Sequence, residues 1–163
     1  MALFSHTCFS KHDDYMTKCS TWKAIAQFIP RDKIIWESFY GDGSSGEHLR
    51  SLGFDVVHEP IDFFKEDRGE IIVSNPPFSM KKEVLQRLKL LGKPFIIIAP
   101  ISTLSTRYMR ETFGNEIQII VPRQRMQFVK IADNGEAHDD GRSNFDSVYF
   151  CWRIGLYRDI VFL

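Results

Sequence analysis

The feature that most constrains this chain is an alternation of short apolar runs with amphipathic stretches. The apolar runs have the length of strands and fall at residues 34–39, 54–58, 70–74, 95–99 and 117–121. Amphipathic stretches of helical length fall between or after them, at residues 44–52, 80–91 and 103–113. Strand–helix alternation is typical of βαβ units. The pattern therefore predicts an α/β fold with a doubly wound, mostly parallel sheet.

The two ends of the chain depart from this alternation. Residues 126–131 and 146–153 have the composition of strands, and no helix is predicted between them. We expect these runs to form an antiparallel pair at the C-terminal edge of the sheet, with residues 132–142 as a polar hairpin loop. A short helix is expected at 21–28, and Pro30 is expected to end it.

Length and charge narrow the class of protein. A chain of 163 residues predicts a single domain, and 21 basic against 21 acidic side chains give no net charge. Neutrality argues against a non-specific nucleic-acid binder, which usually carries a basic excess. Three irregularly spaced cysteines indicate a reducing compartment. With neither a signal peptide nor a membrane span in the sequence, we expect a soluble intracellular protein of the cytoplasm or nucleus, with no membrane partner.

Polar and glycine residues follow the first predicted strands. In parallel sheets, ligands bind beyond the carboxyl ends of the strands. Residues 41–46 read Gly-Asp-Gly-Ser-Ser-Gly and match G-x-G-x-x-G before a helix, although a plain glycine turn is the alternative. Glu59 follows the second strand and is placed to bind a ribose diol, while Asp62 and Phe63 form an acid–aromatic pair. The three features in succession predict a cofactor that contains a nucleoside.

The third predicted strand ends in Ser74-Asn75-Pro76-Pro77-Phe78. Two prolines fix the backbone and remove two N–H donors, and the residue before a proline is held extended. The turn therefore holds the Asn75 amide in place, and Phe78 can present a ring face. Such a site can accept both hydrogens of a planar amino group and stack on its ring. The alternative is a Pro-Pro loop that only starts a helix.

At these residues the chain resembles the S-adenosylmethionine-dependent amino methyltransferases, especially the N6-adenine ones. Asn75-Pro76-Pro77-Phe78 resembles their catalytic motif, and residues 37–43 resemble their cofactor loop. Residues 62–64 are similar to their adenine-side motif. Residues 14–17 are similar to the N-terminal segment that closes over the cofactor.

The resemblance extends over nearly the whole chain. The tail at 123–128 and 145–150 is similar to the late hairpin of phage-type DNA adenine methyltransferases. The motif also resembles that of mRNA cap adenosine N6-methyltransferase catalytic domains. Ser38 and Lys18 stand where these families commonly have proline. No target-recognition module fits in this length, so we expect a small flipped or single-stranded target, a protein partner that supplies target recognition, or both.

The resemblance implies a Rossmann-like methyltransferase fold, with residues 1–163 as one catalytic domain and 1–30 as its cofactor-closing segment. It implies catalysis by Asn75, Pro76, Pro77 and Phe78. It implies that S-adenosylmethionine is bound by Tyr15, Thr17, Glu37, Phe39, Gly41, Asp42, Gly43, Glu59, Asp62 and Phe63. Glu37 would hold the amino group of the cofactor, directly or through water.

The implied reaction is transfer of a methyl group to N6 of adenine in RNA or DNA. The Asn75 side-chain oxygen and the Pro76 carbonyl would each accept one N–H of the amino group, and Phe78 would stack on the base. The base must be unpaired or flipped to reach such a site. Arg123, Arg125 and Lys130 are the expected phosphate contacts, joined by Lys81 and Lys82. Phe128 would stack from the far side.

Other functions remain open at this point. A protein glutamine N5-methyltransferase would use the same motif on a planar amide. An oxidoreductase would bind a nicotinamide dinucleotide at the glycine loop. An inactive subunit of a methyltransferase pair is a third alternative. We predict no metal site, because the spacing of His6, Cys8, His12 and Cys19 matches no standard zinc pattern.

Overall fold

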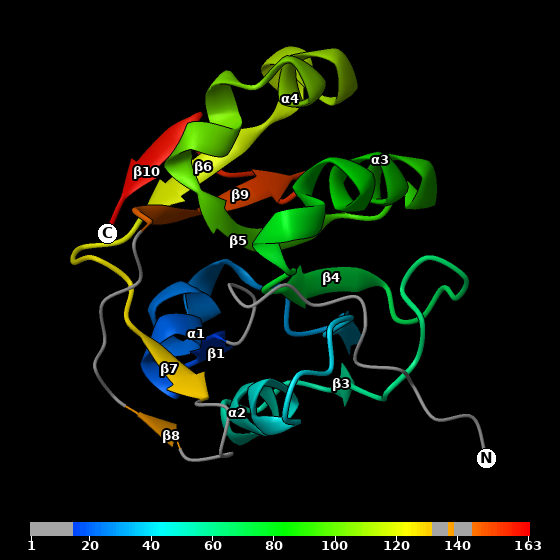
Figure 1. The fold of residues 1–163 in the computed structure, drawn as a ribbon, viewed down its shortest axis with the longest axis vertical. Coiled ribbons are helices and arrows are strands. Elements are labelled where there is room, and N and C mark those ends of the chain that lie inside the picture. The colour runs from blue at the N-terminus through cyan, green and yellow to red at the C-terminus, as the bar shows by residue number, and fades with distance from the viewer. Residues whose placement is uncertain (1–14, 132–136, 139–144) are drawn as a thin grey trace.

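The computed structural model describes residues 15–131, 137–138 and 145–163. The centre of this part of the chain is a seven-stranded sheet in the order β10-β6-β9-β5-β4-β2-β3 (Figure 1). Its strands are β2 (Ile35–Trp36), β3 (Val56–Val57), β4 (Ile71–Ser74), β5 (Phe95–Pro100), β6 (Gln118–Val121), β9 (Ser147–Trp152) and β10 (Ile160–Phe162). Every pairing is parallel except the two that β9 makes. The predicted Rossmann-like α/β class is thereby confirmed.

The antiparallel strand comes from the C-terminal part of the chain, as predicted, but its position needs correction. β9 lies between β5 and β6 instead of at the edge. All six of its residues are buried, so the strand needs backbone partners on both sides. The outermost strand is β10, which pairs in parallel with β6. We did not predict β10, although Ile160, Val161 and Phe162 form a short apolar run.

A second, three-stranded antiparallel sheet has the order β1-β7-β8. It contains β1 (Tyr15–Thr17), β7 (Phe128–Ile131) and β8 (Ala137–His138). The pair expected between 126–131 and 146–153 is therefore wrong, because β7 pairs with β1 and β8. Apart from Ala137 and His138, the stretch expected as a hairpin loop lies outside the described residues.

Helices cover the two faces of the main sheet (Figure 1). One face packs against α1 (Cys19–Ile25) and α2 (Ser44–Ser51), and the other against α3 (Lys81–Leu91) and α4 (Arg107–Thr112). Alternate residues of a strand point to opposite faces. In β5, Ile96 belongs to the core cluster that contains Trp22 of α1, while Ile97 belongs to the core cluster that contains Leu88 of α3. The sheet is thus doubly wound.

Several boundaries differ from the sequence expectation. The helix expected at 21–28 begins at Cys19 and ends in a 3-10 turn over Ala26–Phe28. The helix expected at 103–113 is shortened to α4, because a 3-10 turn over Ile101–Ser105 precedes it and the Thr106 hydroxyl caps its start. In the part of the chain that the structure describes, no helix has the length and apolar character needed to cross a membrane.

Candidate active site

The site is built where β2 and β4 end. These strands are parallel neighbours, with Ile35 opposite Ile71 and Trp36 opposite Ile72. The chain therefore leaves both strands at the same edge of the sheet, where parallel α/β sheets bind ligands. Residues 37–43 follow β2, and Asn75-Pro76-Pro77-Phe78 follows β4. The topology brings the glycine loop and the proline turn side by side, as the sequence predicted.

Of the two polar atoms of the Asn75 side-chain amide, one makes a hydrogen bond and the other makes none with the described residues. Its Nδ2 donates to Thr17 Oγ1 at 3.0 Å. Its Oδ1 is buried and has no hydrogen-bond partner among the described residues. Buried polar atoms without partners are rare and costly, so such an atom needs an explanation. Thr17 is itself only 4% exposed, so its hydroxyl is held in place. The hydrogen bond to this hydroxyl therefore fixes the direction of the Asn75 amide.

The rest of the proline turn supports this arrangement. Pro76 and Pro77 are buried, and Phe78 is half-buried at the start of a 3-10 turn that runs into α3. The Phe78 ring meets Phe145 edge to face, with centroids 5.8 Å apart and an interplanar angle of 81°. The next residue, Asp146, forms an ion pair with Arg125 at 3.2 Å. The segment that carries Arg125 is thereby brought close to the proline turn.

The glycine loop adopts a backbone that other residues rarely take. Gly41 and Gly43 have φ of +57° and +86°. A Cβ on Gly41 would lie 2.9 Å from the sulfur of Met16, and one on Gly43 would lie 3.1 Å from the Tyr40 hydroxyl. Next to this loop is an open groove of about 420 Å³. It is lined by Met16, Thr17, Lys18, Cys19, Asp42, Ser44, His48 and Val129.

Glu37 does not lie where we expected it. Its side chain is 1% exposed, and Oε1 accepts hydrogen bonds from Phe39 N at 3.2 Å and from Ser74 Oγ. Burial raises the pKa of this carboxyl, although His58 and the hydrogen-bond donors act in the opposite direction. The prediction that Glu37 holds an amino group of the cofactor is corrected, because the carboxylate is directed into the interior.

Sequence reasoning missed His58, which lies behind the glycine loop. Its Nδ1 donates to the Glu37 carbonyl at 2.9 Å, and its ring stacks on Tyr40 with centroids 4.9 Å apart. A Cβ on Gly46 would lie 2.4 Å from this ring, so the third glycine of the motif makes room for the histidine. A single histidine beside Glu59 gave no pattern by which to find it.

The remaining predicted cofactor residues differ in how exposed their side chains are. Phe63 is 3% exposed and packs against Phe39, so it does not present a ring face and that prediction is corrected. Tyr15 is half-buried, and its ring meets Phe128 edge to face. Glu59 is exposed and Asp62 is half-buried, and both lie in the first part of the β3–β4 connection, where Asp62 Oδ1 accepts from Phe64 N at 2.9 Å.

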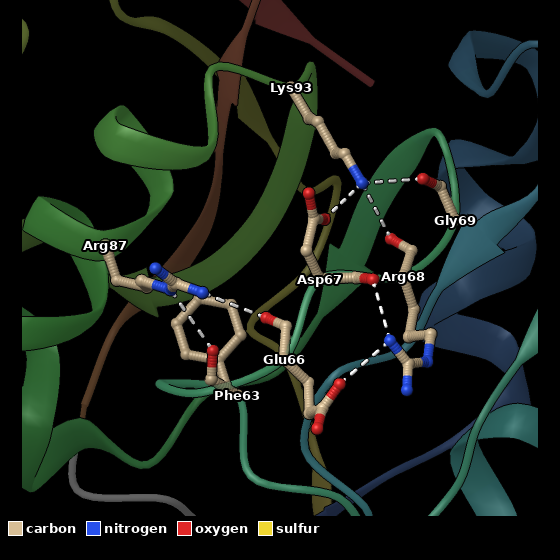
Figure 2. Close-up of polar contacts among 7 residues, drawn as sticks. All are labelled: Phe63, Glu66, Asp67, Arg68, Gly69, Arg87 and Lys93. Carbon is tan, nitrogen blue, oxygen red and sulfur yellow. Dashed lines mark hydrogen bonds and ion pairs between the residues drawn. The ribbon is translucent and has the colours of Figure 1, made fainter.

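The connection from β3 to β4 is held from outside by two basic side chains (Figure 2). Arg87 of α3 donates to the Phe63 carbonyl at 3.3 Å and to the Glu66 carbonyl at 3.0 Å. Lys93 donates to the carbonyls of Arg68 and Gly69 and forms an ion pair with Asp67. These contacts fix the backbone of the segment that carries Asp62.

The predicted phosphate contacts are partly brought together. Arg123 and Lys130 are exposed, and Arg123 makes no hydrogen bond or ion pair with another described residue. Arg125 is paired with Asp146, which lowers the positive charge near the proline turn. Phe128 is 2% exposed and lies in the core, so the prediction that it stacks on a target base is wrong. β7 needs this apolar residue to pack on the body of the protein.

No group of three or more histidine, cysteine, aspartate or glutamate side chains is arranged to hold a metal within the described residues. His6, Cys8 and His12 lie outside those residues. The prediction of no metal site stays a prediction for the whole chain.

A stretch of 74 residues, 45% of this chain, is 38% identical to the type II methyltransferase M.EcoRI of Escherichia coli. The match spans 19% of that protein, so the chain covers only a small part of the relative. TrmN from Thermus thermophilus superposes over 81% of this chain and 40% of its own, with 10% identity and a TM-score of 0.34, which is too low to define a shared fold. No known family profile matches. The sequence likeness is to a methyltransferase.

Proposed function

We propose that this chain is an S-adenosylmethionine-dependent methyltransferase that modifies the exocyclic N6 of adenine in RNA or DNA. The observation that carries the proposal is the Asn75 amide. Its Nδ2 is engaged by Thr17, and its buried Oδ1 has no partner among the described residues. An oriented acceptor of this kind suits one N–H of a planar amino group. The likeness to a type II methyltransferase supports the same chemistry.

The cofactor supplies an electrophilic methyl group, so the chain has little covalent chemistry to perform. Asn75 Oδ1 and the Pro76 carbonyl accept the two N–H groups of the target, which orients its nitrogen and makes the lone pair more available. Positioning and fixed dipoles then provide most of the acceleration. The half-buried ring of Phe78 stacks on the base.

The cofactor site that fits these residues is the groove beside the glycine loop. Gly41 and Gly43 allow a ligand to approach the backbone closely, and the Asp42 side chain lines the groove. Glu59 and Asp62 do not line the groove itself; beyond it, Glu59 is the proposed acceptor for the ribose hydroxyls and Asp62 the proposed contact for the adenine. Thr17 serves this site through its bond to Asn75. Phe63 and Glu37 support the site from the interior.

The target is an unpaired or flipped base, because its amino group must reach a partly buried amide. Arg123 and Lys130 provide exposed positive charge for phosphates, and Arg125 contributes less because of its ion pair. A chain without net charge holds a long polyanion weakly. We therefore also propose a protein partner that supplies target recognition.

The test is incubation with methyl-labelled S-adenosylmethionine and separate pools of RNA, DNA and protein. We expect label in N6-methyladenine of one nucleic-acid pool. Label that appears only in protein would replace the proposal with glutamine methylation. The buried Glu37 presents no carboxylate that would repel the pyrophosphate of a nicotinamide dinucleotide, so that cofactor is tested as well. Thermal stabilisation by a nicotinamide dinucleotide, but not by S-adenosylhomocysteine, would therefore overturn the proposal in favour of an oxidoreductase.

A further inference from the structure

A chain of buried hydrogen bonds runs beneath the proposed site and begins at α1. Trp22 Nε1 donates to Ser45 Oγ at 2.9 Å, and the Ser45 hydroxyl donates to the Glu37 carboxylate. All three side chains are buried. Ser45 is the second residue of α2, so the chain joins α1 and α2 to the end of β2.

The same carboxylate receives a second hydroxyl from the other side. Ser74, which is fully buried, donates from Oγ to Glu37 Oε1, and Phe39 N donates to the same oxygen. The paired residues of β2 and β4 end at Trp36 and Ile72. The Glu37–Ser74 contact therefore joins the two strand ends after their backbone pairing has stopped.

Ser74 immediately precedes Asn75, so whatever fixes Ser74 also fixes the start of the proline turn. We infer that Glu37 is a positioning residue and not a cofactor ligand: through Ser74 it sets the direction of the Asn75 amide relative to α2. This inference rests on the proposed function, because it assigns a role in the same reaction.

A carboxylate is expensive to bury unless several donors satisfy it. Glu37 has three, namely the hydroxyls of Ser45 and Ser74 and the Phe39 N–H. Stability alone would be served as well by an apolar side chain of similar volume. The presence of a carboxylate here is explained by its hydrogen bonds, which connect the end of β2 with α2 and with β4.

α2 also reaches Asn75 from the opposite side. His48 Nδ1 donates to the Thr17 carbonyl at 3.2 Å, and Thr17 Oγ1 accepts from Asn75 Nδ2. His48 lies three residues after Ser45, so one turn of α2 carries both connections. The helix that follows the glycine loop is therefore connected to the Asn75 amide through Thr17.

The experiment compares Ser74→Ala with Ser147→Ala, measuring single-turnover methyl transfer at saturating cofactor and the Kd for S-adenosylhomocysteine. Ser147 is a matched control, because its hydroxyl is also buried in a strand but has no partner among the described residues. We expect Ser74→Ala to lower the single-turnover rate by about tenfold or more, with the Kd changed less than about twofold. Ser147→Ala should retain the wild-type rate.

Glu37→Gln provides the second measurement and keeps an acceptor oxygen for Ser74 and Phe39. A positioning role predicts a smaller loss of rate, about threefold to tenfold, with the Kd nearly unchanged. A direct cofactor contact predicts a Kd raised by about tenfold or more with the rate at saturation preserved, and that result would overturn the inference. If Ser74→Ala does not fold, the rate and the Kd of Glu37→Gln alone distinguish the positioning role from a direct cofactor contact.

The two proposals fail in different ways. An inactive wild-type chain, given every substrate pool, would remove the proposed function and this inference with it. An active wild type whose Ser74→Ala variant keeps the full single-turnover rate would contradict the positioning role alone.

Discussion

At the scale of single residues, the site is defined by which polar atoms are already engaged. Asn75 has its nitrogen bonded to Thr17 and its oxygen buried without a partner in the described structure. Glu37 is the reverse case, because its carboxylate is engaged by three donors, one from α2, one from β4 and one from the loop after β2. Asn75 thus has an acceptor oxygen left for the proposed target, whereas the acceptor oxygens of Glu37 are used within the protein.

Asn75→Ala should lower the rate of methyl transfer by about 100-fold or more, since one preorganised hydrogen-bonding group at a reacting centre is typically worth that much. The Kd for S-adenosylhomocysteine should change less than about threefold, because Asn75 is proposed to bind the target. Both are measured with purified protein. Unchanged turnover would refute the catalytic assignment.

Gly43→Val should raise the Kd for S-adenosylhomocysteine by more than about tenfold, because a β-branched residue is strained at positive φ and would crowd the Tyr40 side chain within the loop. Gly155→Val is the matched control. Gly155 has φ of +76° and open space around it, so it carries similar strain of about 1–2 kcal/mol away from the site. Equal effects of the two variants on binding, measured by calorimetry, would contradict the loop assignment.

The Glu37 carboxyl should make folding stability depend on pH. Burial raises its folded-state pKa above the ordinary value of 4.5, so the folded protein holds the proton more tightly than the unfolded chain. This stabilising contribution is complete below pH 4.5 and is lost as the pH rises through the raised folded-state value. Relative to Glu37→Gln, the wild-type Tm should therefore fall as the pH rises from 4.5 toward neutrality. Parallel Tm curves for the two proteins would disprove this.

At the scale of elements, local sequence patterns were sufficient where a segment's own apolar face decides its structure. α3 has Val84, Leu85 and Leu88 on one buried face and ends at Gly92, whose φ is +67°. The strands β1 and β10 were missed, because three-residue strands are formed by their partners and carry no period of their own. The apolar period of 126–131 was visible in the sequence, but its partner strands were not.

The β3–β4 connection should loosen in Arg87→Met, because the guanidinium bonds two carbonyls of that segment. We expect amide hydrogen exchange over residues 61–67 to accelerate by about tenfold, which corresponds to losing roughly 1.4 kcal/mol of local stability. Arg107→Met on α4, which removes only an exposed ion pair with Glu111, serves as the control. If amide exchange over residues 61–67 stayed as slow as in the wild type in both variants, the Arg87 hydrogen bonds would not be holding this segment.

At the scale of the whole molecule, the zero net charge and the placement of the arginines bear on how the proposed nucleic-acid substrate would be bound. The formal charge is zero, and Arg125 is paired with Asp146. Within residues 123–125, Arg123 is thus the exposed cation that has no hydrogen bond or ion pair with another described residue. For the proposed nucleic-acid substrate, we therefore expect weak binding by the chain alone. It agrees with the proposed partner.

Arg123→Ala should raise the KM for the nucleic acid by about threefold to tenfold with little change in kcat, because a phosphate contact adds affinity without acting on the reacting atoms. The KM should also become less sensitive to salt. Arg158→Ala, an exposed arginine that follows β9 and precedes β10, is the control. A fall in kcat without a change in KM would place Arg123 at the chemistry instead.

The sequence by itself determined the α/β class, the position of the glycine loop and the proline turn at strand ends, and Asn75 as the candidate acceptor. These follow from local patterns, since hydrophobic period, glycine and proline act within a few residues. The tertiary structure decided the rest: β9 lies inside the sheet, Phe128 and Phe63 are core residues, and Glu37 faces Ser74 and Ser45. The direction of a side chain depends on donors and packing partners distant in sequence, and only the folded chain brings these together.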